Sequence, residues 1–153
     1  MSASHAAPAI QFQGLTPIIH VSDIVASMKY YTEVLGFENH WGIVNGFASI
    51  SRDRCHFFLC EGDQGHVGSW TYIGVRDVDA VFEELQSRGA KVRHPPTNYD
   101  WACEMQVEDP DGNVLRIGSD RKPNEPNGEW LDMHGRRWIQ TANRNWREVT
   151  ETR

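Results

Sequence analysis

The chain has 153 residues, 39% hydrophobic and 24% charged, a composition typical of one globular domain rather than a disordered chain. Its formal net charge of −6 disfavours binding to the phosphate backbone of a nucleic acid. No apolar run reaches the roughly 20 residues of a membrane span, and the first 14 residues lack the basic and apolar regions of a signal peptide. We therefore expect a cytoplasmic protein whose partners include neither nucleic acid nor membrane.

The charge is divided unevenly along the chain. Residues 1–120 contain 16 acidic and 8 basic residues, whereas residues 121–153 contain 5 acidic and 7 basic residues. An acidic body is compatible with a cationic ligand, although the same acids also serve simply to keep a protein in solution.

The first structured segment is predicted to contain one strand, one helix and three further strands, after a flexible tail over residues 1–14. Residues 15–21 have strand character, and Asp23 is a good helix N-cap because its carboxylate can accept hydrogen bonds from free backbone N–H groups. Apolar residues then recur at helical spacing until Gly36, which predicts a helix over 23–35. Further strands are predicted at 37–41, 47–51 and 56–61, with a turn at Asn45-Gly46.

The same order of elements returns 54 residues later. The sequence Val-Ser-Asp-Ile-Val-Ala at 21–26 aligns with Val-Arg-Asp-Val-Asp-Ala at 75–80. A strand is predicted at 70–75 and a helix at 77–88, followed by strands at 91–94, 102–108 and 113–119. The repeat over 15–120 predicts an α+β fold in which two βαβββ modules form an open, curved mixed sheet, with the helices on its outer face.

Residues 121–153 form a separate C-terminal extension. It begins with a linker rich in Pro and Asn and then contains three of the six tryptophans, Trp130, Trp138 and Trp146. Because a disordered tail is seldom so rich in tryptophan, we predict an ordered segment with a hairpin that turns at His134-Gly135. We expect it to dock on the acidic body of its own or a partner subunit; the alternative is a flexible appendage.

The repeat resembles the vicinal oxygen chelate superfamily, which includes glyoxalases, extradiol dioxygenases and bleomycin-resistance proteins. The motifs are individually weak but specific in this order, namely Val21-Ser22-Asp23, Tyr30-Tyr31, Leu35-Gly36-Phe37, Val75-Arg76-Asp77-Val78 and Asp109-Pro110-Asp111-Gly112-Asn113. The stretches 47–53 and 101–110 are most similar to the bleomycin-binding branch. That branch is implied to bind and sequester drugs as a homodimer, without chemistry.

The resemblance also implies where a metal would be held, on the inner face of the sheet. Aligned on the motifs, the ligand positions of the metal-using relatives are Thr16, His56, Trp70 and Arg116 here. Only His56 is a good ligand, because tryptophan offers no lone pair and arginine is a fixed cation. A catalytic site usually needs about three protein ligands, so we expect no metal, no cofactor and no catalytic residue.

Strand alternation gives the inner face an aromatic character. Stacking surfaces with a few polar groups suit a flat, partly polar ligand, aromatic or cationic, although aromatic residues also pack a second core or a dimer interface. The predicted ligand-binding residues are Phe47, His56, Phe58, Trp70, Tyr72 and Arg116, with His20 beside them, Trp41 and Trp101 at the rim, and Glu104 as an anionic contact.

Three functions remain open on this evidence. The first is a non-catalytic homodimer that binds and sequesters an antibiotic-like small molecule. The second is a metal-dependent lyase, isomerase or dioxygenase, and the third is a regulatory binding domain without a drug role. The metal content of the purified protein separates the first two.

Overall fold

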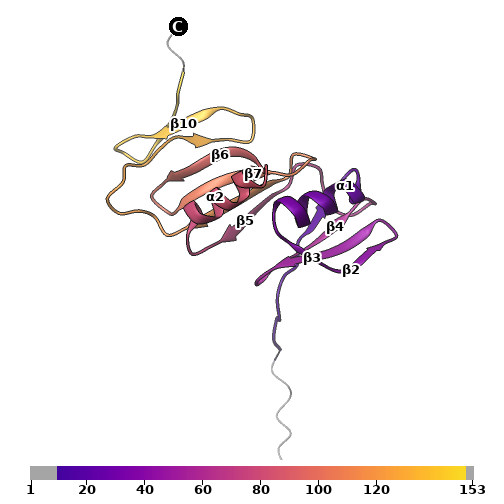
Figure 1. The fold of residues 1–153 in the computed structure, drawn as a ribbon. Helices are drawn as coiled ribbons and strands as arrows, with labels where there is room; N and C mark the ends of the chain where they lie inside the picture. Colours follow the sequence, from indigo (N-terminus) through magenta and orange to yellow (C-terminus); the bar gives the residue numbers. More distant parts are fainter. Residues whose placement is uncertain (1–9, 151–153) are drawn as a thin grey trace, which may run out of the picture.

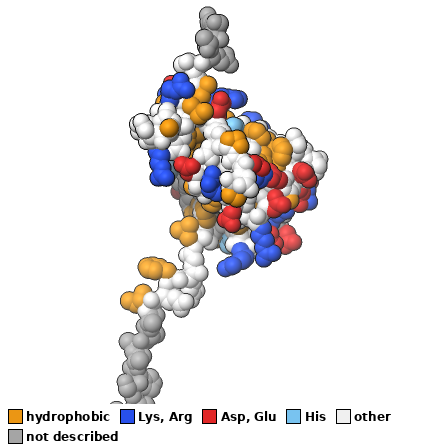
Figure 2. Space-filling view, turned by 90° about the vertical axis from the view of Figure 1, so that its left-hand side faces the viewer, with side chains coloured by type: hydrophobic (Ala, Val, Ile, Leu, Met, Phe, Trp, Pro, Cys, Tyr) orange, Lys and Arg blue, Asp and Glu red, His pale blue; other side chains and the backbone are white. Residues whose placement is uncertain are grey.

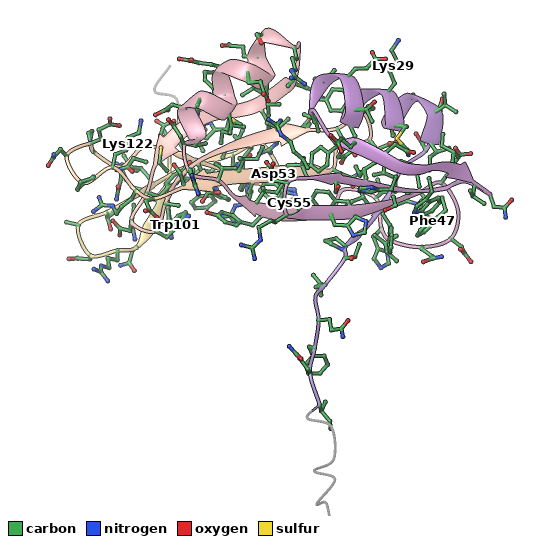
Figure 3. All side chains as sticks on the ribbon, turned by 60° about the horizontal axis from the view of Figure 1, so that its bottom comes forward. Lys29, Phe47, Asp53, Cys55, Trp101 and Lys122 are labelled. Atoms are coloured by element: carbon green, nitrogen blue, oxygen red, sulfur yellow. The ribbon has the colours of Figure 1, made fainter. Side chains whose placement is uncertain are left out.

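The structure, a computed structural model, describes residues 10–150. Two similar modules lie side by side, and a third small sheet lies beside the second module (Figure 1). Both helices cover the same side of the sheets (Figure 3). The predicted α+β fold with two βαβββ modules is confirmed. Of the expected N-terminal tail, residues 1–9 lie outside the described residues, and residues 10–14 are exposed and without helix or strand.

The first module is a mixed sheet in the order β1-β4-β3-β2. The outer strand β1 is parallel to β4, and the remaining pairs are antiparallel. The strands are β1 (Ile18–His20), β2 (Glu38–Val44), β3 (Phe47–Arg52) and β4 (Cys55–Cys60).

The second module repeats this arrangement in the order β5-β8-β7-β6, with β5 parallel to β8. Among the described residues, no backbone ladder joins the two sheets. The strands are β5 (Trp70–Gly74), β6 (Lys91–Asn98), β7 (Cys103–Glu108) and β8 (Val114–Ser119).

The two helices begin where their N-caps predict. Asp23 accepts a hydrogen bond from the backbone of Ala26 and starts α1 (Ile24–Lys29), which continues as a π-helical turn over Tyr30–Val34. Asp77 does the same for α2 (Val78–Ser87). Neither helix has the length and apolar character needed to cross a bilayer, within the part of the chain that the structure describes.

The core lies between the helices and the sheets. Alternation along a strand sends every second side chain to this side, and those side chains are almost completely buried. They include Ile19, Ala48, Ile50, Phe57, Leu59, Leu115 and Ile117. The expected division of the strands into an inner and a helix-covered face is therefore correct in both modules.

Each helix docks on a hairpin turn of the other module. Tyr30 donates a hydrogen bond from its hydroxyl to the backbone oxygen of Glu108, and Tyr31 donates to Asp109, at 2.7 and 3.1 Å. On α2, the carboxylate of Glu84 binds the guanidinium of Arg52 at 2.7 Å. Tyr30 and Glu84 are separated by the 54 residues of the repeat, so equivalent helix positions hold the two modules together.

The C-terminal extension forms the third sheet, with strand order β11-β10-β9. Its first two strands form the predicted hairpin, whose turn lies between Asp132 and Arg136. A third strand, which the sequence did not predict, completes the sheet. The strands are β9 (Trp130–Leu131), β10 (Arg137–Gln140) and β11 (Trp146–Glu148).

Candidate functional site

The inner face of the first module is a continuous row of rings. Trp41 stacks on Phe47 with 6.2 Å between ring centroids, and Phe47 lies 5.2 Å from Phe58. Phe58 in turn meets His56 edge to face at 5.2 Å, and His40 lies 5.8 Å beyond His56. We call these five residues the first-module face. It gathers four of the predicted ligand-binding residues, and Trp41 is half exposed.

Two serine–histidine pairs give this face its polar character. The Nε2 atom of His56 lies 2.6 Å from the hydroxyl of Ser49, and the Nε2 atom of His40 lies 2.6 Å from the hydroxyl of Ser51. A neutral imidazole is both donor and acceptor, so each pair can orient a polar group of a ligand. His40 and Ser51 were not among the predicted binding residues, although alternation on β2 and β3 could have indicated them.

His20 lies on β1 beside this face, because its neighbour Ile19 points into the core. The Nδ1 atom of His20 is buried and has no hydrogen-bond partner among the described residues. The loop before β5 crowds the strand here, since a Cβ on Gly65 would lie 3.0 Å from the backbone oxygen of Ile18. His20 therefore lines the margin of the face and not its centre.

The second module places the other predicted residues on its own inner face. Arg116 lies over the ring of Tyr72 at 5.5 Å, and Trp70 is covered by the guanidinium of Arg93 at 5.3 Å. The carboxylate of Glu104 is 1% exposed and is bound by Arg116 and by the indole N–H of Trp101. The sequence suggested Glu104 as an anionic contact for a ligand. In the structure, its carboxylate is already paired with Arg116 of the same chain.

The C-terminal extension packs against the inner face of the second module. Trp130 lies 6.3 Å from Trp70, 5.6 Å from Tyr99 and 6.1 Å from Trp101 between ring centroids. The guanidinium of Arg116 lies 4.9 Å from its ring. From the sequence, Trp130, Trp138 and Trp146 were candidates for a strap over either the cavity mouth or the subunit seam, and the structure places Trp130 over the inner face of the second module.

The residues at the implied metal positions do not fit a metal. Trp70 offers no lone pair to a metal ion, and Arg116 is a cation that is already bound to Glu104. Within residues 10–150, no three His, Cys, Asp or Glu side chains come together as a metal-binding group. No chemical step can be derived through such a centre.

Besides a small cavity of about 300 Å³ near Asp100 and Thr141, the described residues enclose two larger cavities outside the first-module face. The larger, about 640 Å³, lies at the seam between the modules and is lined mainly by core side chains such as Leu35, Val81 and Leu85. The smaller, about 520 Å³, lies between the second module and the extension. The rest of the lining of the larger cavity includes charged side chains of the β3–β4 turn and of the segment before α2, such as Arg54 and Asp77.

The predicted site residues therefore form two separate groups in one chain. Phe47 and Trp101 lie at opposite ends of the molecule in Figure 3. The first group lies on the first-module face, whereas the second lies beside the extension, where Tyr72 and Trp101 remain 51% and 46% exposed. One chain does not bring them into a single cavity.

The match to protein families agrees with this fold. The family model for the Glyoxalase/Bleomycin resistance protein/Dioxygenase superfamily matches residues 9–117. The chain belongs to this superfamily. Residues 118–153, which contain the extension, lie beyond the superfamily match, and no curated protein sequence matches the chain.

Solved structures of other superfamily members have the same fold. One is a bleomycin-binding protein from bleomycin-producing Streptomyces verticillus in complex with copper(II)-bleomycin, 23% identical, with a TM-score of 0.62 over 74% of this chain and 100% of that chain. Another is TnmS3, an antibiotic-binding protein from Streptomyces sp. CB03234, 21% identical, with a TM-score of 0.64 over 73% of this chain and 99% of that chain. A third is a glyoxalase/bleomycin resistance protein/dioxygenase from Nocardioides, 18% identical, with a TM-score of 0.60 over 79% and 92%.

Proposed function

We propose that this protein is a non-catalytic, cytoplasmic homodimer that binds and sequesters an antibiotic-like small molecule in an aromatic cavity at the dimer interface. The observation that carries the proposal is the first-module face. Its stacked rings are partly exposed in the single chain, Trp41 the most, and its serine–histidine pairs offer donors and acceptors at fixed places. Stacking area combined with a few oriented polar groups is what binds a flat, partly polar ligand.

The dimer is supported by apolar surface that one chain leaves uncovered. Ile10 and Phe12 are 97% and 96% exposed, and Leu15 is nearly as exposed. The N-terminal segment that contains them, which we call the arm, leaves the body on the side of the sheets away from the helices (Figure 3), and hydrophobic side chains stand out along it in Figure 2. Glutamines alternate with the first two apolar residues, so one edge of the arm is apolar. We propose that this apolar edge packs against a second copy of the chain.

Two further observations support the proposal. The implied metal positions hold residues that do not suit a metal, which favours binding over chemistry. Two of the superfamily members with the same fold are antibiotic-binding proteins. The cytoplasmic location rests on Cys55, Cys60 and Cys103, none of which forms a disulfide in the structure.

The proposal is tested by thermal unfolding with bleomycin as the probe, metal-free and loaded with copper(II). A ligand that binds only the native state raises the melting temperature, by about 5–10 °C at a hundredfold excess over Kd. We expect Phe47→Ser to abolish this shift. Val25→Ala is the control, because Val25 is exposed on α1, on the opposite side of the sheet. No shift with bleomycin or with other antibiotics of cationic or polycyclic type would contradict the proposal.

The enzyme alternative has its own measurement. Gently purified protein should contain less than one divalent ion per chain. One stoichiometric ion that is lost in His56→Ala, while the fold is retained, would favour a metal-dependent enzyme.

A further inference from the structure

The extension turns part of the second module into a pocket. The cavity of about 520 Å³ is lined by four tryptophans and two charged side chains, namely Trp101, Trp130, Trp138, Trp146, Arg116 and Asp132. We call it the tryptophan pocket. Only Trp101 and Arg116 come from the second module; the other four lie beyond the residues that match the superfamily.

Hydrogen bonds attach the β9 segment of the extension to the second module. The hydroxyl of Tyr99 and the Nε2 atom of His94 both bind the backbone oxygen of Glu129, at 2.9 and 2.8 Å. The side-chain amide of Gln106 donates to the backbone oxygen of Leu131 at 2.9 Å. Because these donors lie on and beside the central strands, the position of β9 is fixed relative to the sheet. The pocket is thus part of the folded structure, formed before any ligand arrives.

Its walls present free indole surface. Trp101 stacks on Tyr99 with one face, at 4.8 Å and 6° between the rings, which leaves its other face uncovered by that ring. Trp146 lies 6.1 Å from Trp101, tilted by 56°. The two tryptophans are 46% and 39% exposed. Large aromatic surfaces held open in this way are the usual feature of a binding site.

The charges at the pocket are balanced and fixed. Arg116 is neutralised by the two hydrogen bonds to Glu104. Desolvation acts to raise the pKa of Asp132, but hydrogen bonds from Trp138, from the backbone of Arg136 and His134 and from the Arg136 side chain outweigh it and hold the pKa well below its usual range. Asp132 therefore stays ionised and is paired with Arg136 at 2.9 Å, beside indole rings whose faces are electron-rich.

We propose that the tryptophan pocket binds a planar aromatic group that carries a positive charge. The indole faces supply stacking area and attract a cation through their quadrupoles. Each guanidinium at the pocket is paired with a carboxylate, Arg116 with Glu104 and Arg136 with Asp132, so neither repels a cation strongly and the attraction comes from the indole faces. The inference rests on the proposed function, a small-molecule binder, and adds the chemical class of the bound group and its place under the C-terminal extension.

The test uses two planar tricyclic probes of opposite charge on the full chain, the cation proflavine and the anion anthracene-2-sulfonate. Fluorescence anisotropy at 0.3 M NaCl measures each Kd, because this salt concentration screens binding to exposed acidic residues. We expect saturable binding of proflavine, tighter than that of the anion. Trp146→Ala should weaken proflavine binding about tenfold or more, since one stacking surface is lost. Trp146→Phe should restore part of the affinity.

Trp41→Ala removes a tryptophan of similar exposure from the first-module face and shows whether the probe binds there instead. The control is Val25→Ala, which shortens an exposed side chain on α1, away from both aromatic surfaces. Both substitutions should leave the Kd for proflavine within about twofold, and circular dichroism verifies that each variant remains folded. Loss of proflavine binding in Trp41→Ala but not in the Trp146 variants would overturn the tryptophan pocket and leave the proposed function intact. Tighter binding of the anion, or no saturable binding of either probe, would overturn the inference, whereas the bleomycin titration decides the proposed function separately.

Discussion

Arg116 binds Glu104 through two hydrogen bonds, from Nε to Oε2 and from Nη2 to Oε1, each 2.8 Å long. The pair spans the neighbouring strands β7 and β8 and lies next to Trp130. Glu104 is the most deeply buried acid on the inner face, and the ion pair also raises the pKa of Arg116. The pair occupies the part of the sheet where the resemblance implied a metal ligand.

Removal of one partner of this pair should destabilise the fold more than replacement of both partners by apolar residues. Arg116→Met leaves a buried carboxylate without its cation, and we expect the free energy of unfolding to fall by about 3 kcal/mol. The double variant Arg116→Met with Glu104→Leu removes both charges and should recover most of the loss. Urea unfolding of the two variants measures the difference. A single variant as stable as the double variant would show that the pair does not hold this face together.

Trp130 should anchor the extension. Its ring contacts Trp70, Tyr99 and Trp101, so Trp130→Ala should lower the free energy of unfolding by about 2 kcal/mol, less than a fully buried ring would contribute. Met133→Ala is the control, because Met133 is exposed in the adjacent turn and should change stability by less than about 0.5 kcal/mol. Equal effects of the two substitutions would contradict the anchoring role.

His94 should make the attachment of the extension sensitive to acid. Burial lowers the pKa of His94 below its ordinary value of 6.5; the hydrogen bond to Glu129 opposes this, and the nearby guanidiniums of Arg137 and Arg93 add to it. Because the folded pKa lies below the unfolded one, the unfolded chain binds the proton more readily. The contribution of neutral His94 to the free energy of unfolding is therefore complete above about pH 6.5 and is lost as the pH falls through the pKa of His94 in the folded protein.

The variant His94→Gln tests this dependence, since glutamine retains a donor but does not titrate. Between pH 7.5 and 5.0 the native protein should lose more unfolding free energy than the variant. Parallel pH profiles of the two proteins would eliminate His94 as the titrating group.

The exposed arm should contribute to self-association. Phe12→Ser combined with Ile10→Ser removes the apolar edge. We expect the dimer of this variant to dissociate at higher protein concentrations than the dimer of the unsubstituted chain. Gln11→Ser combined with Gln13→Ser changes the opposite edge and should leave association unchanged. Sedimentation velocity over a concentration series measures both. A native chain that is monomeric throughout the series would contradict the proposed dimer itself.

Several features of the fold follow from local sequence. The 54-residue repeat, the N-caps Asp23 and Asp77, and alternation along the strands were enough to predict two βαβββ modules. They also indicated which side chains face the helices. Ser49, His56 and Phe58 could be assigned to one face for the same reason, because strand geometry sends alternate side chains to opposite sides.

The contacts between distant segments were not accessible in this way. The tryptophans of the extension were visible in the sequence, but their composition does not say which surface they cover. Likewise, the sequence named both Glu104 and Arg116 as binding residues but could not show that they form an ion pair with each other.

The sequence alone therefore determined the elements of the two modules, their order and the face on which each of their strand residues lies, since these depend on helical and strand periodicity within a few residues. The tertiary structure decided that Trp130 packs over the second module, that Glu104 is bound by Arg116, and that the predicted site divides between the inner faces of the two modules. These outcomes depend on packing between segments some 14 to 60 residues apart, such as the contacts of Trp130 with Arg116 and Trp70. Burial of large aromatic surface determines such packing, and no local pattern encodes its partner.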